Sequence, residues 1–453
     1  MQELIQSQRD FFNTNATKSI QFRKQQLQKL EDAIKANEQL MYDAIYKDFK
    51  KSEFDTFTTE IALIFSDIKE AKKKVARWAK TKRKRTNIIN LPGKSYVIPE
   101  PLGVSLIIGA WNYPYYLSFA PVISAMVAGC SIILKPSEVP SNTSAVIAKI
   151  VNDNFDPSYF KVVEGGVQET SALLNEKFDK IFFTGSTTVG RIVYKAAAKH
   201  LTPVTLELGG KSPAFITEGS NLKMAAKRLI WAKFLNAGQT CIAPDYLLVD
   251  KNIKNEFLEL LKYEIKNSHF TIDNDNYVQI VNTKNTERLI KLIDTDKVCF
   301  GGKYNLENRT IEPTILDNIT FEDTIMQEEV FGPILPILTY DNLDEMIAQV
   351  KSGQKPLSCY VFTKNKTIKN KILSEISFGG GCVNDAMIHI SNSNLGFGGV
   401  GESGMGSYHG EEGFRAFSHY KSMLHKSTIF EPNIKYFPHT KGKLNILKKL
   451  FRL

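Results

Sequence analysis

A carboxylate and a thiol mark the two ends of one segment of the chain, and both residue types can take part in covalent catalysis. Glu207 lies in the run Leu206–Pro213, which contains two adjacent glycines, and Cys241 ends the run Asn236–Cys241. Small residues let backbone approach a ligand closely, an ionised thiol is a strong nucleophile, and a nearby carboxylate can serve as the base for a second step. The pKa of a cysteine is readily lowered to about 7 or below at an active site. A buried cysteine and a surface carboxylate are the ordinary alternative, but two glycine-containing motifs that frame one helical segment favour a catalytic pair.

The segment Phe182–Gly190 has the pattern of an apolar strand that passes through a glycine turn into a helix. The N-terminus of such a helix offers unpaired N–H groups and the positive end of the helix dipole to a pyrophosphate. Its glycine spacing differs from the GxGxxG fingerprint of dinucleotide-binding proteins. The pattern alone therefore leaves an ordinary strand-to-helix turn as an alternative.

Three further segments carry polar side chains that could face a ligand. Trp111–Pro114 contains Asn112, whose amide N–H₂ group can stabilise an oxyanion without titrating. Lys135–Glu138 joins a lysine, which can donate to ribose hydroxyls, to a carboxylate, which can accept from them. Met326–Pro333 places Glu329 next to apolar residues. Taken singly, each has a plainer explanation: a loop asparagine, a solvated ion pair or a surface carboxylate.

Together, and in the same order over most of the chain, these motifs resemble those of the NAD(P)-dependent aldehyde dehydrogenase superfamily. The resemblance implies that Cys241 is the nucleophile, that Glu207 is the base, and that Asn112 and the backbone N–H of Cys241 hold the oxyanion. It also implies coenzyme contacts for Trp111, Lys135, Glu138, Thr184, Gly185, Ser186, Val189, Gly190, Glu329 and Phe331.

Three features resemble the class 3, fatty-aldehyde branch of this superfamily: a short first helical region, a cysteine that comes early in the chain, and the ending Gly404–Gly410. Members of that branch are typically homodimers and often accept either NAD or NADP. We therefore expect a homodimer that oxidises a medium- or long-chain aliphatic aldehyde or an aromatic one. NAD is the expected coenzyme and NADP the alternative, because Glu138 can accept from the ribose 2′-OH and disfavours a 2′-phosphate.

The mechanism implied by the resemblance has two half-reactions. Cys241 attacks the aldehyde carbon and hydride passes to the nicotinamide; a water activated by Glu207 then hydrolyses the thioester to a carboxylic acid. A CoA-acylating dehydrogenase of the same fold would resolve the thioester with CoA, and members of that type often lack the base carboxylate. A non-catalytic binding protein on the same scaffold is a further alternative, which the presence of all three catalytic residues disfavours.

A Cys–His hydrolase would need a histidine that lies close in space to a cysteine. None of His200, His409 and His419 is beside a cysteine in the sequence. We expect these histidines to be structural or surface residues.

The elements around the motifs predict an α/β protein. Residues 3–80 have apolar positions at helical spacing and contain no glycine or proline, which predicts long uninterrupted helices. Pro101–Leu134 contains no charged residue and is long enough for a transmembrane helix. Its prolines, asparagine and glycines instead favour a strand, a turn, a helix and a second strand of a buried parallel sheet. Strand and helix patterns keep alternating to about residue 390.

At 453 residues the chain is too long for one hydrophobic core. We predict an aldehyde-dehydrogenase-like fold with a Rossmann-type coenzyme domain, an α/β catalytic domain and a small bridging or oligomerisation element. The predicted boundaries are 1–80 for N-terminal helices of the coenzyme domain, 81–100 for a bridging segment, 101–208 for the coenzyme domain, 209–395 for the catalytic domain, and 396–453 for a return to the coenzyme domain, an oligomerisation segment and a basic tail.

The net charge of +10 is concentrated in basic runs between residues 69 and 85 and in the tail from Lys441 onward. Solvated faces explain such runs, and no nucleic-acid-binding signature accompanies them, so we expect no nucleic acid partner. Five cysteines without paired spacing predict neither a disulfide framework nor a CxxC metal site. They indicate a reducing compartment, and with no signal peptide pattern at the N-terminus we expect a cytoplasmic protein with no bound metal.

The tail Lys441–Leu453 predicts an amphipathic basic helix. Its apolar side would carry Leu444, Leu447, Leu450 and Phe451, and its basic residues are Lys441, Lys448, Lys449 and Arg452. This is the pattern of a helix that lies in a membrane interface, and the tail is too short to span a bilayer. The alternative is a helix packed across a dimer, or a frayed terminus.

Overall fold

The computed structural model describes residues 1–273 and 277–451. The chain divides into a large unit, Met1–Trp78 with Pro101–Ser418, and a small unit, Ala79–Glu100 with His419–Leu453. The predicted boundaries at 208/209 and 395/396 fall inside the large unit, and they stay predictions.

The N-terminal region is helical, as predicted, but it is interrupted. Its elements are α1 (Gln2–Asn13), α2 (Ile20–Ala36), α3 (Glu38–Phe49), α4 (Glu53–Thr56), a π-helical turn η2 (Phe57–Ile61) and α5 (Ala62–Trp78). The breaks need no glycine or proline, because Asn15 and Lys50 adopt left-handed backbone with φ of 65° and 60°. Ser19 and Ser52 then cap the helices that follow, each accepting from a backbone N–H. The prediction of long uninterrupted helices is therefore wrong.

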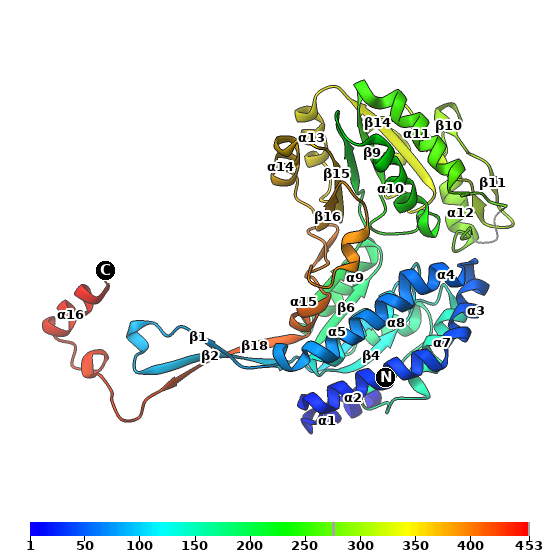
Figure 1. Ribbon diagram of the computed structural model, residues 1–453. Coiled ribbons are helices and arrows are strands. Elements are labelled where there is room, and N and C mark those ends of the chain that lie inside the picture. The colour runs from blue at the N-terminus through cyan, green and yellow to red at the C-terminus, as the bar shows by residue number, and fades with distance from the viewer. Residues whose placement is uncertain (274–276, 452–453) are drawn as a thin grey trace. The chain divides into compact units, whose positions relative to one another are not determined.

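A six-stranded sheet forms the first α/β layer of the large unit (Figure 1). Its strands, in spatial order, are β17 (Gly404–Met405), β7 (Val204–Glu207), β6 (Lys180–Thr184), β3 (Val104–Ile108), β4 (Ser131–Lys135) and β5 (Phe160–Val162). All neighbours pair in parallel except β17, which is antiparallel to β7. The helices of this region are α6 (Tyr116–Ala128), α7 (Ser141–Asn152), α8 (Val167–Leu174), α9 (Thr187–Ala198) and α15 (Gly410–Ala416).

The charge-free run from Pro101 to Leu134 forms β3, α6 and most of β4, as predicted. Every residue of these three elements is buried, which explains why they are continuously apolar. From β3 the chain adds β4 and β5 on one side and then β6 and β7 on the other. The strand order therefore reverses next to β3, and ligands of such sheets bind at the carboxyl ends of the strands near that point.

A seven-stranded sheet forms the second α/β region. Its strands, in spatial order, are β10 (Val298–Phe300), β13 (Thr314–Leu316), β14 (Ile334–Tyr340), β9 (Tyr246–Asp250), β8 (Pro213–Ile216), β15 (Ser358–Phe362) and β16 (Gly380–Val383). Only β10 pairs antiparallel. The accompanying elements are α10 (Leu222–Phe234), α11 (Lys254–Asn267), α12 (Thr283–Ile290), α13 (Leu343–Ser352), α14 (Lys366–Glu375) and the short strands β11 (Tyr304–Asn305) and β12 (Thr310–Ile311).

The small unit contains β1 (Lys82–Lys84), β2 (Gly93–Pro101) and β18 (Ser418–Lys426), in the order β1-β2-β18, and the helix α16 (Lys441–Phe451) (Figure 1). By sequence it holds 14 basic and two acidic residues, a net charge of +12 against +10 for the whole chain. The excess positive charge of the protein thus belongs to this unit. Among the described residues, no helix combines the length and apolarity needed to cross a bilayer.

Candidate active site

Four predicted site residues lie at the same edge of the six-stranded sheet. Lys135 ends β4, Thr184 ends β6, Glu207 ends β7, and Asn112 lies in the turn that follows β3. Because these strands are parallel, their carboxyl ends meet, and residues far apart in the sequence converge.

A cavity of about 1520 Å³ lies at this edge, and its wall includes Cys241, Glu207 and Asn112. The predicted coenzyme residues that line it are Trp111, Lys135, Glu138, Thr184, Gly185, Ser186, Val189, Glu329 and Phe331. Gly190 is the exception. A Cβ at Gly190 would come within 2.6 Å of a methyl group of Leu208, so this glycine lets α9 pack closely rather than lining the cavity.

The turn that presents Cys241 has an unusual backbone. After α10, the residues Asn236, Ala237 and Gly238 have successive φ values of 55°, 51° and 72°. Left-handed backbone costs roughly 1–2 kcal/mol for a residue that carries a Cβ. A Cβ at Gly238 would overlap the carbonyl of Gly332, so only glycine fits there. Strain of this kind clusters at functional sites, and the sequence showed only that the turn residues are small.

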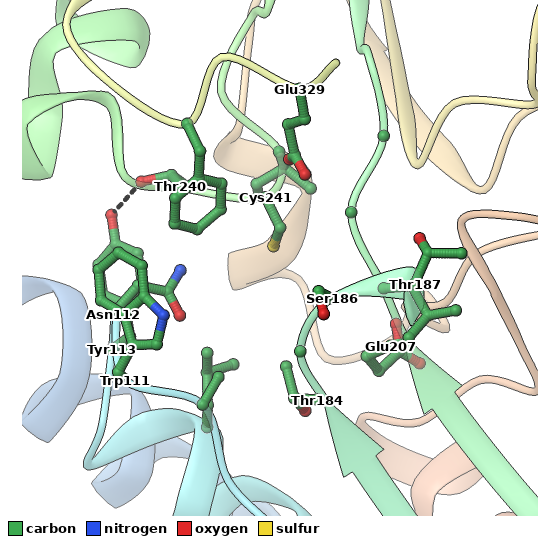
Figure 2. A pocket seen from close by; sticks show the side chains of 18 of the residues that line it. Trp111, Asn112, Tyr113, Thr184, Ser186, Thr187, Glu207, Thr240, Cys241 and Glu329 are labelled. Carbon is green, nitrogen blue, oxygen red and sulfur yellow. Dashed lines mark hydrogen bonds between the residues drawn. The ribbon is translucent and has the colours of Figure 1, made fainter. Parts of the chain in front are cut away.

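The Cys241 thiol points into the cavity (Figure 2). Burial raises the pKa of the Cys241 thiol, and the carboxylates of Glu329 and then Glu207 raise it further. Backbone N–H groups of Cys241 and Ile242 oppose this shift by stabilising the thiolate. The surroundings of Cys241 in the folded chain thus favour the thiol over the thiolate.

Asn112 is 3% exposed and lies in the turn before α6. Its Nδ2 donates to the carbonyl of Gln239 at 3.1 Å. Because an amide has two hydrogens, one N–H remains for a ligand. The next residue binds the nucleophile loop as well, since the Tyr113 hydroxyl and Thr240 Oγ1 are 2.7 Å apart (Figure 2). Two hydrogen bonds thus connect the turn that carries Asn112, the candidate donor to an oxyanion, with the loop that carries Cys241.

Glu207 is 3% exposed, and within the described residues neither carboxylate oxygen has a hydrogen-bond partner. Burial raises the pKa of Glu207 well above its ordinary value. Glu207 pairs with Thr184 across β6 and β7, where the strand-to-helix turn begins (Figure 2). An unpaired carboxyl group in a cavity is costly for stability and marks a candidate functional group.

Glu329 and Phe331 lie in the loop before β14. The rings of Phe331 and Trp111 are 5.3 Å apart between centroids and meet edge to face. A Cβ at Gly209 would overlap the Glu329 carboxylate, while the N–H of Gly210 stabilises its charged form. Burial and the nearby carboxylate of Asp245 still raise the pKa of Glu329 to about 8. The adjacent glycines noted in the sequence are therefore needed for close approach of this side chain.

Sequence reasoning missed two residues that hold this loop. Lys211 Nζ lies 2.5 Å from a carboxylate oxygen of Asp245 and donates to the carbonyls of Ile325 and Glu328 at 3.0 and 2.8 Å. Asp245 also accepts from the N–H of Val330 at 2.9 Å. The only sequence signal for Lys211 was its position in the run Leu206–Pro213, which also contains Glu207.

The other end of the cavity fits a dinucleotide. Ser186 caps α9, whose first N–H groups face the cavity wall formed by Gly185 and Ser186. Thr184 Oγ1 is buried and has no partner among the described residues. Lys135 is 1% exposed, and its Nζ lies 3.7 Å from the half-exposed carboxylate of Glu138. A helix N-terminus for phosphate and a Lys–Glu pair for ribose hydroxyls are the groups that NAD(P) requires.

Within residues 1–273 and 277–451 one Cys–His contact is present, although not at a predicted residue. Cys382 Sγ lies 3.5 Å from Nδ1 of His389. Burial raises the pKa of Cys382 and lowers that of His389 to about 4, so both groups are neutral near pH 7. His409 is buried against the Tyr116 hydroxyl at 3.2 Å, and burial lowers its pKa to about 3. These groups do not form the ion pair of a Cys–His hydrolase.

Comparison with known proteins agrees with the site. Residues 1–423 match the family model described as the aldehyde dehydrogenase family. The chain is 45% identical over 446 residues to 4,4'-diaponeurosporen-aldehyde dehydrogenase of Staphylococcus aureus (strain NCTC 8325 / PS 47), covering 98% of this chain and 97% of that protein. It is 42% identical to aldehyde dehydrogenase family 3 member H1 of Arabidopsis thaliana, covering 99% and 94%.

A solved structure described as the substrate bound state of Staphylococcus aureus AldH superposes with a TM-score of 0.96 at 44% identity, covering 99% of both chains. The family 3 relative agrees with the class 3 branch that the sequence indicated. The chain belongs to the aldehyde dehydrogenase family, as an enzyme that oxidises an aldehyde to the carboxylic acid with NAD or NADP.

Proposed function

We propose that Cys241 binds the aldehyde covalently, that Asn112 stabilises the oxyanion and that Glu207 activates the hydrolytic water. The observation that supports this assignment is that all three side chains line one cavity in which the Glu207 oxygens lack a partner among the described residues. A carboxylate without a local partner is available to accept a hydrogen bond from water.

In the first half-reaction the Cys241 thiolate attacks the aldehyde carbon to give a thiohemiacetal. The oxyanion accepts from the Asn112 amide and from the Cys241 backbone N–H. Because the thiol pKa is raised, the Cys241 proton has to pass to a base when substrate binds. Glu207 and Glu329 can accept it only in their ionised forms, whose share near neutral pH is reduced because burial raises the pKa of both groups. Bound NAD(P)⁺ supplies the hydride acceptor.

In the second half-reaction Glu207 takes a proton from water, which attacks the thioester carbonyl. The carboxylic acid leaves and the Cys241 thiol is restored. General-base assistance of this type contributes about 10²–10⁴-fold. Hydrolysis is preferred over transfer to CoA because the base carboxylate is present, and release of free acid without CoA checks this choice.

The coenzyme would be held along the carboxyl ends of the strands. The strand-to-helix turn Thr184–Ser186, with Val189 in the first turn of α9, would bind the pyrophosphate. Lys135 and Glu138 would bind the adenosine ribose, which favours NAD over NADP, while Glu329, Phe331 and Trp111 would position the nicotinamide. Gly190 would contribute only by letting α9 approach the sheet.

Replacement of the nucleophile tests this assignment. Cys241→Ser should lose dehydrogenase activity and keep coenzyme binding, because a serine hydroxyl stays protonated near neutral pH. Cys382→Ser is the matched control, since that cysteine is also partly exposed but does not line the cavity. Turnover of the Cys241→Ser variant at the wild-type rate would contradict the assignment.

The preferred substrate is a medium- or long-chain aliphatic or an aromatic aldehyde. The wall of the cavity that contains Asn112 and Cys241 also includes Trp231, Leu235 and Phe397, which suit an apolar chain. A relative is named for an aldehyde of diaponeurosporene. A series of aldehydes of increasing length should show kcat/KM rising with chain length, whereas a preference for short polar aldehydes would contradict this.

We propose a homodimer that associates through the small unit. β18 is an edge strand, and Ile429 and Phe437 are 96% and 83% exposed. Unpaired strand edges and exposed apolar residues favour association. Light scattering should give twice the chain mass, and a monomer would contradict the proposal.

The basic tail is proposed to bind anionic membrane surfaces peripherally. α16 forms as predicted, with Leu444 and Phe451 50% and 67% exposed, while Arg452 lies outside the described residues. Each basic residue near an anionic leaflet contributes about 1 kcal/mol, and the net charge of +12 on the small unit supports the proposal.

The free state of all five cysteines supports a cytoplasmic location.

A further inference from the structure

A buried ion pair lies behind the turn that carries Asn112, and none of the roles above uses it. Lys51 Nζ is 2.6 Å from Oε1 of Glu60, and the two side chains are 1% and 0% exposed. Lys51 belongs to the connection between α3 and α4, and Glu60 to the π-helical turn η2. A buried pair contributes little net stability, because desolvation of the two charges offsets their attraction.

The second oxygen of Glu60 binds the start of α6. Oε2 accepts from the backbone N–H groups of Tyr115 and Tyr116 at 2.8 and 3.1 Å. These donors belong to the first turn of the helix, where a negative charge also interacts favourably with the helix dipole. The carboxylate therefore fixes where α6 begins, four residues after Asn112.

Lys51 contacts the residue that directly follows Asn112. Its Nζ lies 4.2 Å from the centroid of the Tyr113 ring, which is the geometry of a cation–π contact. The Tyr113 hydroxyl is in turn 2.7 Å from Oγ1 of Thr240, the residue before Cys241. The ion pair thus contacts the segment that follows Asn112 at two places, the Tyr113 ring and the start of α6, and reaches the nucleophile loop through the Tyr113 side chain.

The turn η2 also forms part of the cavity wall. Thr58 and Thr59 line the cavity, while Glu60, the next residue, is fully buried behind it. Single π-helical turns occur frequently at functional sites, because they change the direction in which neighbouring side chains point. This turn places consecutive residues on the cavity wall and against the start of α6.

We propose that the Lys51–Glu60 pair positions the Asn112 amide and the Cys241 thiol relative to each other. In these positions the amide can contact the oxygen, and the thiol the carbon, of the same substrate carbonyl group. The proposal rests on the roles given above to Asn112 and Cys241. A purely structural pair would affect folding but not the chemical step of the folded enzyme. Misplacement of a reacting group by about 1 Å can cost on the order of 10²-fold in rate.

The double variant Lys51→Met/Glu60→Gln separates these two cases. Methionine fills the lysine volume, and the glutamine oxygen can still accept from the N–H groups of Tyr115 and Tyr116. Uncharged, well-packed replacements of a buried pair are often neutral for stability. The thermal midpoint should therefore stay near that of the wild type, while the burst rate of reduced coenzyme falls about 10–100-fold. Coenzyme affinity should not change.

The exposed pair Lys149–Asp153, 2.7 Å apart, gives the matched control, and Lys149→Met/Asp153→Asn should keep wild-type kinetics. A folded double variant at residues 51 and 60 with a wild-type burst rate would overturn the proposal. If that variant does not fold, Glu60→Asp, which shortens the carboxylate and keeps its charge, is measured instead. A folded Glu60→Asp enzyme with unchanged burst rate would equally overturn it.

Failure of this proposal can be told from failure of the catalytic assignment. The Cys241→Ser variant reports on the nucleophile whatever the ion pair does. If Cys241→Ser is inactive and the Lys51→Met/Glu60→Gln enzyme is fully active, the site assignment stands and the positioning role does not.

Discussion

The reactivity of Cys241 is set by its surroundings rather than by its residue type. The thiol is held among apolar groups and near two carboxylates, which raise its pKa, while two backbone N–H groups stabilise the thiolate only in part. A thiol of this kind stays protonated at neutral pH and does not react indiscriminately. Nucleophilic attack then depends on a base that acts when substrate is in place.

This predicts a steep pH dependence of thiol modification. Because the thiol pKa is raised, the thiolate fraction of Cys241 should grow about tenfold per pH unit between pH 7 and 9. The rate of alkylation by iodoacetamide, followed on the Cys241 peptide by mass spectrometry, should grow in the same proportion. Cys241→Ser gives the blank. A rate that levels off below pH 8 would show that the thiol pKa is not raised.

Helix α10 contains a buried charge whose cost should be measurable. Lys233 is 1% exposed, and burial lowers its pKa to about 8 from 10.5. The unfolded chain therefore binds more protons than the folded protein between these values, and wild-type stability gains as pH rises through this range. Below about pH 8 Lys233 is charged in the folded protein, so the full cost of burying this charge lowers the stability.

Lys233→Met should accordingly raise the thermal midpoint at pH 7 and lose much of that gain at pH 10. A shift of this size corresponds to at most roughly 3 kcal/mol. Lys227→Met, at an exposed position of the same helix, is the control in parallel calorimetry. Destabilisation at pH 7 would mean that the Lys233 ammonium makes interactions that outweigh its burial.

Elements that depend on local pattern could be predicted from the sequence. Strand β3 lies in the charge-free run and β6 leads into the turn at Gly185, both where strands were predicted, because a run of apolar residues between turn residues leaves little choice when both faces of a sheet are buried. Their carboxyl ends carry the motifs, so most of the candidate site could be placed as well. Gly190 was assigned to the ligand because its packing against Leu208 cannot be seen in one sequence.

Features that depend on distant contacts could not be predicted. The helix break at Lys50 involves a residue type that usually continues a helix. The Lys51–Glu60 pair joins residues whose neighbours in the sequence give no sign that either is buried. The raised pKa of the Cys241 thiol could not be predicted either, because it depends on Glu329 and Glu207, which approach Cys241 only in the folded chain.

At the scale of the whole molecule, charge is distributed unevenly between the two units. The small unit carries a net charge of +12, so by difference the large unit is slightly negative. The described residues that line the catalytic cavity all belong to the large unit. Chemistry and surface association are therefore assigned to separate parts of the chain and can be tested separately.

Truncation after His439 tests the surface role. The full chain should float with anionic vesicles at low salt and detach as salt is raised, because screening weakens the attraction. The chain that ends at His439 should float less, and neither should float with neutral vesicles. If the full chain stays in the soluble fraction with anionic vesicles at low salt, the tail is not a membrane anchor. Unchanged activity of the truncated enzyme would show that the cavity is intact.

The covalent intermediate tests the central claim most directly. Glu207→Gln removes the proposed base for thioester hydrolysis and leaves Cys241 and Asn112 in place. Rapid mixing of this variant with aldehyde and NAD⁺ should give one equivalent of reduced coenzyme per active site, followed by a steady state about 10²–10⁴-fold slower than that of the wild type. Mass spectrometry of the quenched protein should find one acyl group, on the peptide that contains Cys241. A variant that shows no burst, carries its acyl group on another residue or turns over at the wild-type rate would contradict the account.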